Sequence, residues 1–494
     1  MDMDTATLAK LGYRQELSRR MGGFSNYAIS LSIICILAGG ITSFHLGFGA
    51  AGGAAIGLGW PLATLLSLAF ACTMAHVASA FPTAGGLYHW ASILGGRGWG
   101  WLTAWFNLLG LITVLAAINV GTFLFIVNAL GPVVGFDWPG LSPESKMLVQ
   151  VLAIALITGT QAIINHLGIR ITTRLTDFSG YLILVVAVAL TICLLVAAPT
   201  LDFSRLVHFA NYSGLPEAAP VWPRNESMGW LFLLGLMLPA YTITGFDASA
   251  HASEETVEAS RNVPRGIVRS VLVSGIVGWV MLCAIVLAMP DLDTAARQGD
   301  NVVFWTIGQV LPKAVATALY IGIAIAQYLC GLATVTSASR MAYAFARDGG
   351  LPLSQYLKRV SDQRRTPVTA IWVTSLLVVG FTLYTPVYST ITTVCVIFLY
   401  VSYLIPTALG LRAYGRTWTT TGPWSIGGHY RWLAFLCVVG AGLLLVVGVQ
   451  PPNEKALGIV EGALLAAAIA WFGSERRRFR GPPGLAAALT TGGE

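Results

Sequence analysis

The sequence contains one aspartate at the end of a long charge-free segment. Asp247 directly follows residues 227–246, which include no Asp, Glu, Lys or Arg. An ionisable side chain in an apolar, membrane-length segment costs at least about 2.5 kcal/mol on insertion scales, so it indicates a functional site. Asp247 could pair with a cationic ligand group or carry a proton. The alternative is a purely structural role, because Asp is also a favourable helix N-cap.

Three further titratable residues follow at helical spacing. On a helix, Asp247 shares a face with His251 and with Glu254 or Glu255. This face could conduct protons into a cytoplasmic vestibule. The alternative, which we favour for the two glutamates, is that they form ion pairs with nearby arginines and hold an intracellular gate closed. The arginines that follow in the sequence are Arg261, Arg265 and Arg269.

Three other polar residues in apolar segments have both a structural and a functional interpretation. His76 could take part in proton coupling, since its pKa is normally near neutrality, or it could simply pack. Thr336 and Ser337 could coordinate Na⁺ through their hydroxyls or bridge neighbouring helices. The seven cysteines form no CxxC pair and the histidines are scattered, so we expect no metal site and no cofactor.

The segments that carry these residues have the composition of membrane helices. Of the 494 residues, 55% are hydrophobic and 10% are charged, against roughly 25% charged in soluble domains. Charge-free runs of about 20 residues, the length that crosses a bilayer, recur along the chain. Two of the runs, 21–96 and 366–411, are long enough for two helices each. The pattern predicts an all-α integral membrane protein with twelve spans.

The distribution of positive charge predicts the orientation. Of the 29 lysines and arginines, 23 fall on the side of the two termini and six on the other side. Positive residues concentrate in cytoplasmic loops, so both termini are expected in the cytoplasm of a multi-pass plasma-membrane protein. This bias accounts for the net charge of +7, and no nucleic-acid partner is expected. Residues 1–20 have no apolar core, so no cleavable signal peptide is predicted.

The spans divide into two five-helix halves and two additional helices. The predicted segments are a cytoplasmic tail (1–24), a first repeat (25–200), an extracellular loop (201–227), a second repeat (228–411), a cytoplasmic loop (412–430), helices 11 and 12 (431–473) and a cytoplasmic tail (474–494).

The first helix of each half carries a potential interruption near its middle. These are Ala38-Gly39-Gly40-Ile41-Thr42 and Pro239–Gly245. Interruptions at corresponding positions of two halves point to an inverted-repeat transporter with a site between the repeats. The alternative is that the glycines only permit close packing and Pro239 only kinks its helix.

Six motifs in order resemble those of a known family. They are Leu11–Leu17, Gly39–Thr42, Pro82–Trp90, Thr244–Thr256, Pro264–Ile267 and Arg347–Pro352. Together they resemble the amino acid–polyamine–organocation superfamily, specifically its amino acid/choline transporter branch, from residue 11 to about 475.

The resemblance implies a LeuT-like five-plus-five inverted repeat with two peripheral helices, and alternating access to a central site. It implies import of a small amino acid or amine such as γ-aminobutyrate, probable coupling to H⁺, and a protein that is not an enzyme. The first interruption would hold a substrate carboxylate on backbone amides, as helix N-termini favour anions, and the second would receive the amine. The implied binding residues are Ala38, Gly39, Gly40, Ile41, Thr42, Tyr241, Thr242, Thr244, Gly245, Phe246 and Asp247.

Several questions stay open at this stage. His76 stands where many relatives carry Glu, which leaves the coupling ion undecided between H⁺ and Na⁺. Choline or a polyamine is an alternative cargo, and choline would need an aromatic box to which Tyr241, Phe246, Trp105 and Trp279 could contribute. A channel, a sensor that binds without transporting, and a membrane enzyme are weaker alternatives. We expect a monomer.

Overall fold

The computed structural model describes residues 3–138, 140–385, 387–451 and 453–483, which are helical and contain no strand. The last eleven residues of the predicted C-terminal tail, 484–494, lie outside the described residues. The predicted all-α class is therefore confirmed for the described chain.

Twelve apolar helical segments correspond to the twelve predicted spans. Ten are long enough to cross a membrane, and two shorter ones complete the set. The ten are Gly23–Thr42 (α2 and α3), Ala55–Ala80 (η1 and α5), Arg97–Val134 (α7), Pro143–Leu167 (α8), Ile169–Ala197 (α9), Ala259–Ala288 (α13), Lys313–Arg347 (α16), Tyr388–Ala413 (α19), His429–Gly448 (α20) and Lys455–Arg478 (α21, η5 and α22). The two shorter ones are Met228–Thr242 (α10 and α11) and Val368–Tyr384 (α18).

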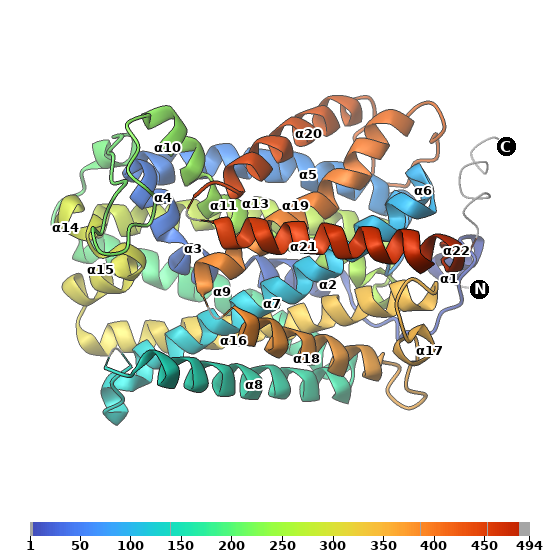
Figure 1. Ribbon diagram of the computed structural model, residues 1–494, viewed down its shortest axis with the longest axis horizontal. Coiled ribbons are helices and arrows are strands. Elements are labelled where there is room, and N and C mark those ends of the chain that lie inside the picture. The colour runs from blue at the N-terminus through green and yellow to red at the C-terminus, as the bar shows by residue number, and fades with distance from the viewer. Residues whose placement is uncertain (1–2, 139, 386, 452, 484–494) are drawn as a thin grey trace.

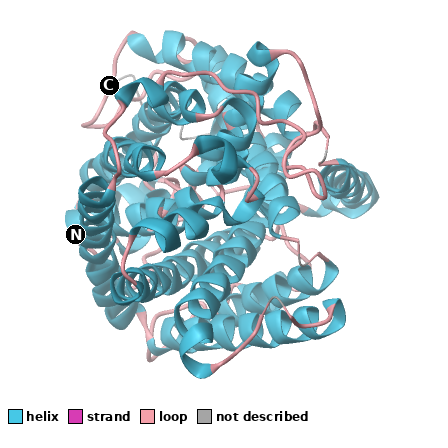
Figure 2. Ribbon diagram, turned by 90° about the vertical axis from the view of Figure 1, so that its left-hand side faces the viewer, coloured by secondary structure: helices cyan, strands magenta, loops and turns pink. Residues whose placement is uncertain are grey.

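Shorter helices lie at the two ends of the bundle. Near α22 (Arg476–Arg478) lies α1 (Met3–Lys10), and this end is called the terminal end (Figure 1). The opposite, distal end carries α4 (Phe44–Ala51), α14 (Leu292–Ala296) and α15 (Val302–Val310). Most spans run lengthwise between these ends and are seen end-on in Figure 2.

Burial separates central from peripheral helices. In the most apolar window of α7, 83% of residues are buried within the protein, whereas the segment that begins with α21 buries 17%. The long α7 packs against α16 and α19. Apolar side chains that remain exposed on α8, α9, α20 and α21 are those that a bilayer would cover. The core therefore surrounds α7, and α20 and α21 lie at the periphery.

The first break lies earlier than predicted. Cys35 adopts a left-handed conformation (φ 37°, ψ 67°) between α2 (Gly23–Ile34) and α3 (Ile36–Thr42), so the Ala38–Thr42 stretch is helical. The expected unwinding at the two glycines is wrong, because they serve packing instead. A Cβ on Gly39 would lie 3.4 Å from Thr242, and one on Gly40 would lie 3.3 Å from Leu282.

The second break lies slightly later than predicted. Pro239 is inside α11 (Met237–Thr242), and the chain unwinds only over residues 243–247, before α12 (Ala248–His251). Gly245 has a φ of 80°, and a Cβ there would lie 2.3 Å from Ile33 at the end of α2. Only glycine fits this position, so the two broken helices touch at their breaks.

Buried amides connect α7, α8 and α16 away from the breaks. Asn119 and Gln161 exchange two hydrogen bonds of 3.0 Å, and Gln161 also donates to the Tyr328 carbonyl at 2.9 Å. Asn165 donates to the Leu332 carbonyl at 3.0 Å. Amides in a membrane interior must be paired within the protein, so these contacts fix the register of three helices.

Asn119→Ala should therefore destabilise the protein by about 1–2 kcal/mol, since it removes both bonds that the Gln161 amide makes to it. The melting temperature in detergent measures this effect. The matched control is Asn128→Ala on the same helix, because the Asn128 amide donates only to the Leu124 carbonyl one turn away. Equal shifts for the two variants would contradict the proposed role of the amide pair.

Candidate functional site

Asp247 lies at the second break with its side chain fully buried. The Tyr403 hydroxyl donates to one carboxylate oxygen at 2.8 Å, and the Asn107 amide donates to the other at 3.0 Å. The Tyr403 hydroxyl also accepts from the Gly245 backbone N–H at 3.0 Å. The Asp247 carboxylate makes no capping bond to α12, so its partners are α7, α19 and His251 rather than its own helix end.

The contacts of His251 require an additional proton at this site. Its Nε2 lies 3.2 Å from the Asp247 carboxylate, and its Nδ1 lies 3.2 Å from the Ala84 carbonyl oxygen. Both neighbours are acceptors, whereas a neutral imidazole carries a single N–H. Both contacts are satisfied only if the ring is an imidazolium or if Asp247 is protonated. The pair is therefore a candidate site for one bound proton within the bundle.

The predicted series of titratable residues, which begins with Asp247 and His251, continues to Glu254 through the backbone of Ala84. The Ala84 N–H donates to a Glu254 carboxylate oxygen at 3.2 Å, while the Ala84 carbonyl faces His251. Asp247, His251 and Glu254 therefore form one series of polar contacts toward the terminal end. Glu255 faces a different partner.

Two buried bidentate ion pairs close the terminal end. Arg347 contacts the Glu254 carboxylate at 2.9 and 3.0 Å, and Arg340 contacts the Glu255 carboxylate at 2.9 and 3.0 Å. Both glutamate side chains are fully buried. Both arginines come from α16, so the arginines that follow in the sequence are not the partners. Arg261 instead makes an exposed contact of 3.9 Å to Glu258.

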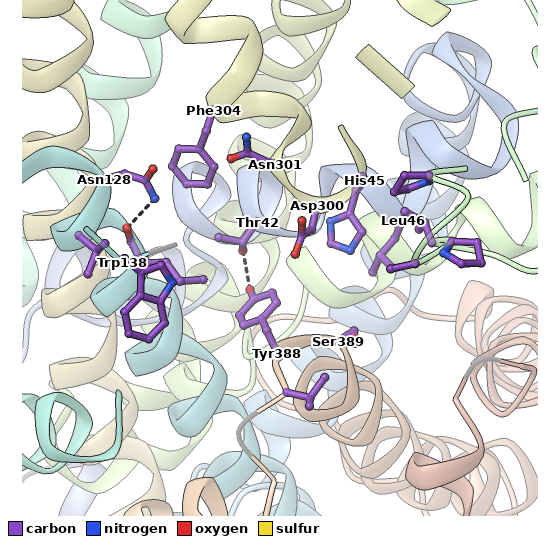
Figure 3. Close-up of a pocket in the computed structure, with 18 of the residues that line it drawn as sticks. Thr42, His45, Leu46, Asn128, Trp138, Asp300, Asn301, Phe304, Tyr388 and Ser389 are labelled. Carbon is purple, nitrogen blue, oxygen red and sulfur yellow. Dashed lines mark hydrogen bonds between the residues drawn. The ribbon is translucent and has the colours of Figure 1, made fainter. Parts of the chain in front are cut away.

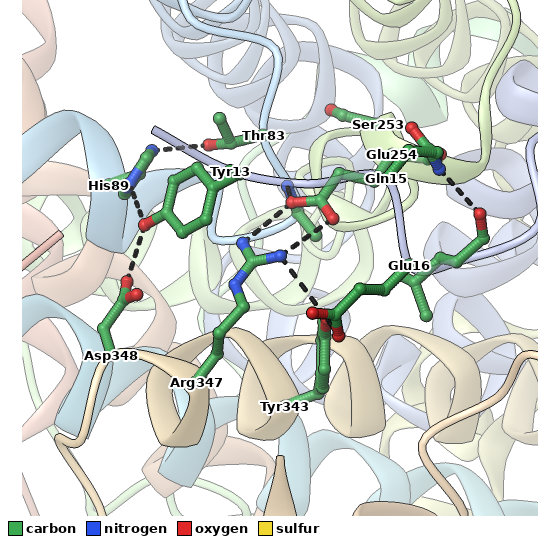
Figure 4. Close-up of polar contacts among 12 residues, drawn as sticks. Tyr13, Gln15, Glu16, Thr83, His89, Ser253, Glu254, Tyr343, Arg347 and Asp348 are labelled. Carbon is green, nitrogen blue, oxygen red and sulfur yellow. Dashed lines mark hydrogen bonds and ion pairs between the residues drawn. The ribbon is translucent and has the colours of Figure 1, made fainter. Parts of the chain in front are cut away.

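The N-terminal segment covers these ion pairs (Figure 4). The Tyr13 ring lies under the Arg347 guanidinium, with 3.9 Å between the guanidinium carbon and the ring centre. Gln15 donates to the Glu254 carbonyl at 2.8 Å. Glu16 accepts from the Tyr343 hydroxyl at 2.8 Å. Residues 13–16 are thus part of the closure, a role that the Leu11–Leu17 motif did not reveal from the sequence.

A hydrogen-bond series anchors Tyr13. Its hydroxyl donates to Asp348 at 2.7 Å and lies 2.6 Å from His89 Nε2. Burial lowers the pKa of His89, in α6 (Leu87–Gly95), to about 3, so this ring is neutral. Its Nε2–H then donates to Tyr13, and its Nδ1 accepts from the Thr83 hydroxyl at 2.8 Å. Burial and the Asp348 carboxylate raise the pKa of Tyr13 and keep its hydroxyl protonated.

A small cavity lies between the two breaks. Its volume is about 10 Å³, room for roughly one water molecule. Four of the predicted binding residues are among those that line it: Gly39, Tyr241, Thr242 and Thr244. Cys35 and Gln327, which were not predicted, also line it. The structure therefore shows this site closed.

A larger cavity of about 640 Å³ lies on the distal side (Figure 3). Tyr388 separates it from the small cavity, because its hydroxyl contacts both Thr42 and the Tyr241 hydroxyl, the latter at 3.2 Å. His45 and Asp300 line the same cavity beyond Tyr388. The pathway is open down to Tyr388 and closed below it.

The remaining predicted residues lie elsewhere. Gly40 packs on α13, Ala38 and Ile41 are buried in α3, and Phe246 packs on Tyr403 with 5.1 Å between ring centres. In α16, Thr336 donates to Asn165 at 2.7 Å, an interhelical bond, while the Ser337 hydroxyl is buried without a partner among the described residues.

His76 lies in an aromatic pocket rather than near Asp247. Its ring is 5.1–5.3 Å from those of Tyr414, Trp418 and Tyr430, and its Nδ1 accepts from the Ile426 N–H at 3.2 Å. These partners belong to or flank residues 412–430, so His76 fixes this loop to α5 (Trp60–Ala80).

A membrane bundle whose two broken helices meet at a buried carboxylate, with closures on either side, has the LeuT-like fold of a membrane transporter. The comparisons with known proteins identify its family. A profile described as amino acid permease matches residues 21–472, so the chain belongs to the amino acid permease family.

Relatives of known name are similar over most of the chain. Amino-acid permease BAT1 of Arabidopsis thaliana is 31% identical over 98% of this chain and 96% of its own length. Its homolog in Oryza sativa subsp. japonica is 31% identical over 97% and 96%. The GABA-specific permease of Saccharomyces cerevisiae is 31% identical over 74% of this chain and 64% of its own length. These proteins are permeases rather than enzymes.

Arg347→Ala should loosen the terminal closure, because it leaves the Glu254 carboxylate buried without its cationic partner, a change that typically costs 3–5 kcal/mol. A cysteine placed at Ala84, in a background without the seven native cysteines, reports the opening through its rate of reaction with a maleimide. The rate should rise at least several-fold. Arg261→Ala, which removes only an exposed contact, should leave it unchanged; similar rates in both variants would refute the closure.

Proposed function

We propose that this permease imports a small amino acid or amine, such as γ-aminobutyrate, together with H⁺ by alternating access. The observation that carries the proposal is that His251 lies 3.2 Å from each of two acceptors at the helix break, the Asp247 carboxylate and the Ala84 carbonyl oxygen. A binding site that contains its own exchangeable proton couples occupancy by ligand to protonation. The name of the yeast relative supports γ-aminobutyrate as one candidate cargo.

The geometry offers a place for each end of an amino acid. The first-turn amides of α3 have no carbonyl acceptor within their helix, and the sulfur of Cys35 contacts those of Ala38 and Gly39, so this helix end suits a carboxylate that would take the place of the sulfur. The proposed binding segment for the carboxylate is therefore the residues just after Cys35, rather than the predicted Ala38–Thr42 stretch. Asp247 and the carbonyls of the second break suit an ammonium group. The small cavity must widen to admit the substrate, which requires Tyr388 to move.

The alternating cycle follows from the two closures. With the terminal end closed, a substrate reaches the site from the distal cavity past Tyr388. An ammonium group next to Asp247 weakens the bond to His251, which in turn alters the contact of Ala84 with Glu254. Loss of that contact favours separation of Glu254 from Arg347 and opening at the terminal end. The substrate and the proton are then released at the open terminal end.

The orientation and location follow from charge. We place both termini in the cytoplasm and the protein as a monomer in the plasma membrane, in agreement with the excess of Lys and Arg at the terminal side. We favour choline less as the cargo, because two of the residues predicted for its aromatic box lie elsewhere. Trp105 and Trp279 donate to the carbonyls of Ala463 and Gly57 and do not line the small cavity.

Asp247→Asn should abolish uptake of radiolabelled substrate into proteoliposomes while the protein still folds, because the amide keeps the shape but neither attracts an amine nor exchanges a proton. Uptake is measured with γ-aminobutyrate and a panel of amino acids, under an imposed pH gradient. The control is Asp177→Asn, which alters a half-buried carboxylate of α9 that bonds to Ser25. Wild-type uptake by Asp247→Asn would exclude this residue from the mechanism.

His251→Gln should separate transport from coupling. Glutamine can bond to Asp247 but cannot carry a proton at neutral pH, so exchange of labelled for unlabelled substrate should persist while accumulation driven by a pH gradient falls at least tenfold. If the variant still accumulates substrate at the wild-type level, the coupling proton is carried by another group.

A further inference from the structure

A groove of about 810 Å³ lies on the side of the bundle at its terminal end. It forms where the end of α6, the start of α7 and the last turns of α19 meet, and its lining includes Trp99, Leu409, Arg412, Arg416 and Thr417. None of its lining residues borders the small central cavity or the distal cavity. The groove is therefore separate from the proposed transport pathway.

The groove carries unbalanced positive charge. Arg412 lies in the last turn of α19 and Arg416 follows four residues later, and both are exposed. Neither guanidinium has a hydrogen bond or ion pair with the part of the chain that the structure describes. No Asp or Glu lines the groove. Two guanidinium groups next to each other match the oxygens of a phosphate.

The other wall of the groove is apolar. Trp99 is 48% exposed, and Leu409 lies about one turn further from the terminal end than Arg412. The two arginines thus lie at the end of the groove nearest the terminal end of the bundle, and Leu409 lies further along the span. Tryptophan at this level is typical of a membrane–water interface.

The neighbouring helices place this groove at the lipid-facing surface. The helix α19, which forms one wall of the groove, packs against both peripheral helices α20 and α21. Both of these helices expose large apolar side chains near the same end, among them Trp432 on α20 and Phe472 just beyond α21. A molecule in the groove therefore meets water and cations at one end and hydrocarbon at the other.

We propose that this groove binds an anionic phospholipid. The phosphate contacts Arg412 and Arg416, and the acyl chains lie along Trp99 and Leu409. With the termini in the cytoplasm, as proposed above, the lipid comes from the cytoplasmic leaflet, whose anionic headgroups attract basic residues near the surface. A free phosphate would leave the apolar wall without an occupant, and a zwitterionic headgroup, whose net charge is zero, would offset none of the charge of the two arginines.

Such a lipid would contact two helices, one that supports the terminal closure and one that holds Asp247. α6 carries His89, which anchors Tyr13, and α19 carries Tyr403, which holds Asp247. Because the groove lies between these two helices, a bound lipid should stabilise the protein with the terminal end closed.

The test uses the full-length protein in a neutral detergent, to which phosphatidylglycerol or phosphatidylcholine is added. Phosphatidylglycerol should raise the melting temperature at a concentration at least tenfold lower than phosphatidylcholine, and added salt should weaken the effect. Arg412→Gln combined with Arg416→Gln should remove this preference. The matched control is Arg170→Gln combined with Arg174→Gln, two exposed arginines with the same spacing at the start of α9, and it should retain the preference.

A second measurement does not depend on the arginine variants. Brominated phosphatidylglycerol quenches nearby tryptophans, so wild-type protein should show a quenched component that Trp99→Phe lacks. Equal loss of the lipid preference in the arginine pair and its control would indicate a general basic surface and overturn the proposal. So would an equal shift with inorganic phosphate alone, or quenching that does not change in Trp99→Phe. None of these results bears on substrate uptake, so the lipid site and the proposed function fail separately.

Discussion

The structure depends on the requirement that every charge and every free backbone group at membrane depth find a partner within the protein. The two helix breaks expose backbone groups, and Asp247 adds a carboxylate beside them. The Tyr403 hydroxyl provides a partner for both groups, because it accepts from the Gly245 N–H and donates to the Asp247 carboxylate. The close contact of Gly245 with Ile33 brings the second break against the first. Burial of the Asp247 carboxylate therefore requires neighbouring helices that supply hydrogen-bond donors, as α7 and α19 do.

The same requirement extends to the terminal end, where Glu254 and Glu255 are buried with their arginine partners. The backbone of Ala84 contacts both His251 and Glu254, so the proton site and the closure share one peptide unit. In the proposed cycle, this shared peptide unit is the route by which a change in protonation at Asp247 and His251 reaches the Glu254–Arg347 pair. The N-terminal segment adds its own contacts to this region through Tyr13 and Gln15.

Much of this arrangement could be predicted from the sequence. Charge-free runs predicted the twelve spans, and Asp247, two residues after Gly245, was predicted as a site residue and lies buried at the second break. The break positions were less predictable, because glycine permits both unwinding and close packing; Gly39 and Gly40 pack, whereas Cys35 breaks the helix. The partners Asn107, Tyr403, Arg340 and Arg347 come from distant spans, so local patterns could not assign them. His76 illustrates the converse case, in which a titratable residue in a membrane helix anchors a loop.

The spacing of the two gate arginines has a consequence for how tightly transport is controlled. Arg340 and Arg347 are seven residues apart on α16, two helical turns, and both bond to a short segment that contains Glu254 and Glu255. Because each arginine belongs to the same rigid helix, one pair cannot separate far while the other stays intact. Release of the two ion pairs should therefore be cooperative. Under the proposed proton-coupled cycle, such a gate would limit uncoupled leakage of protons.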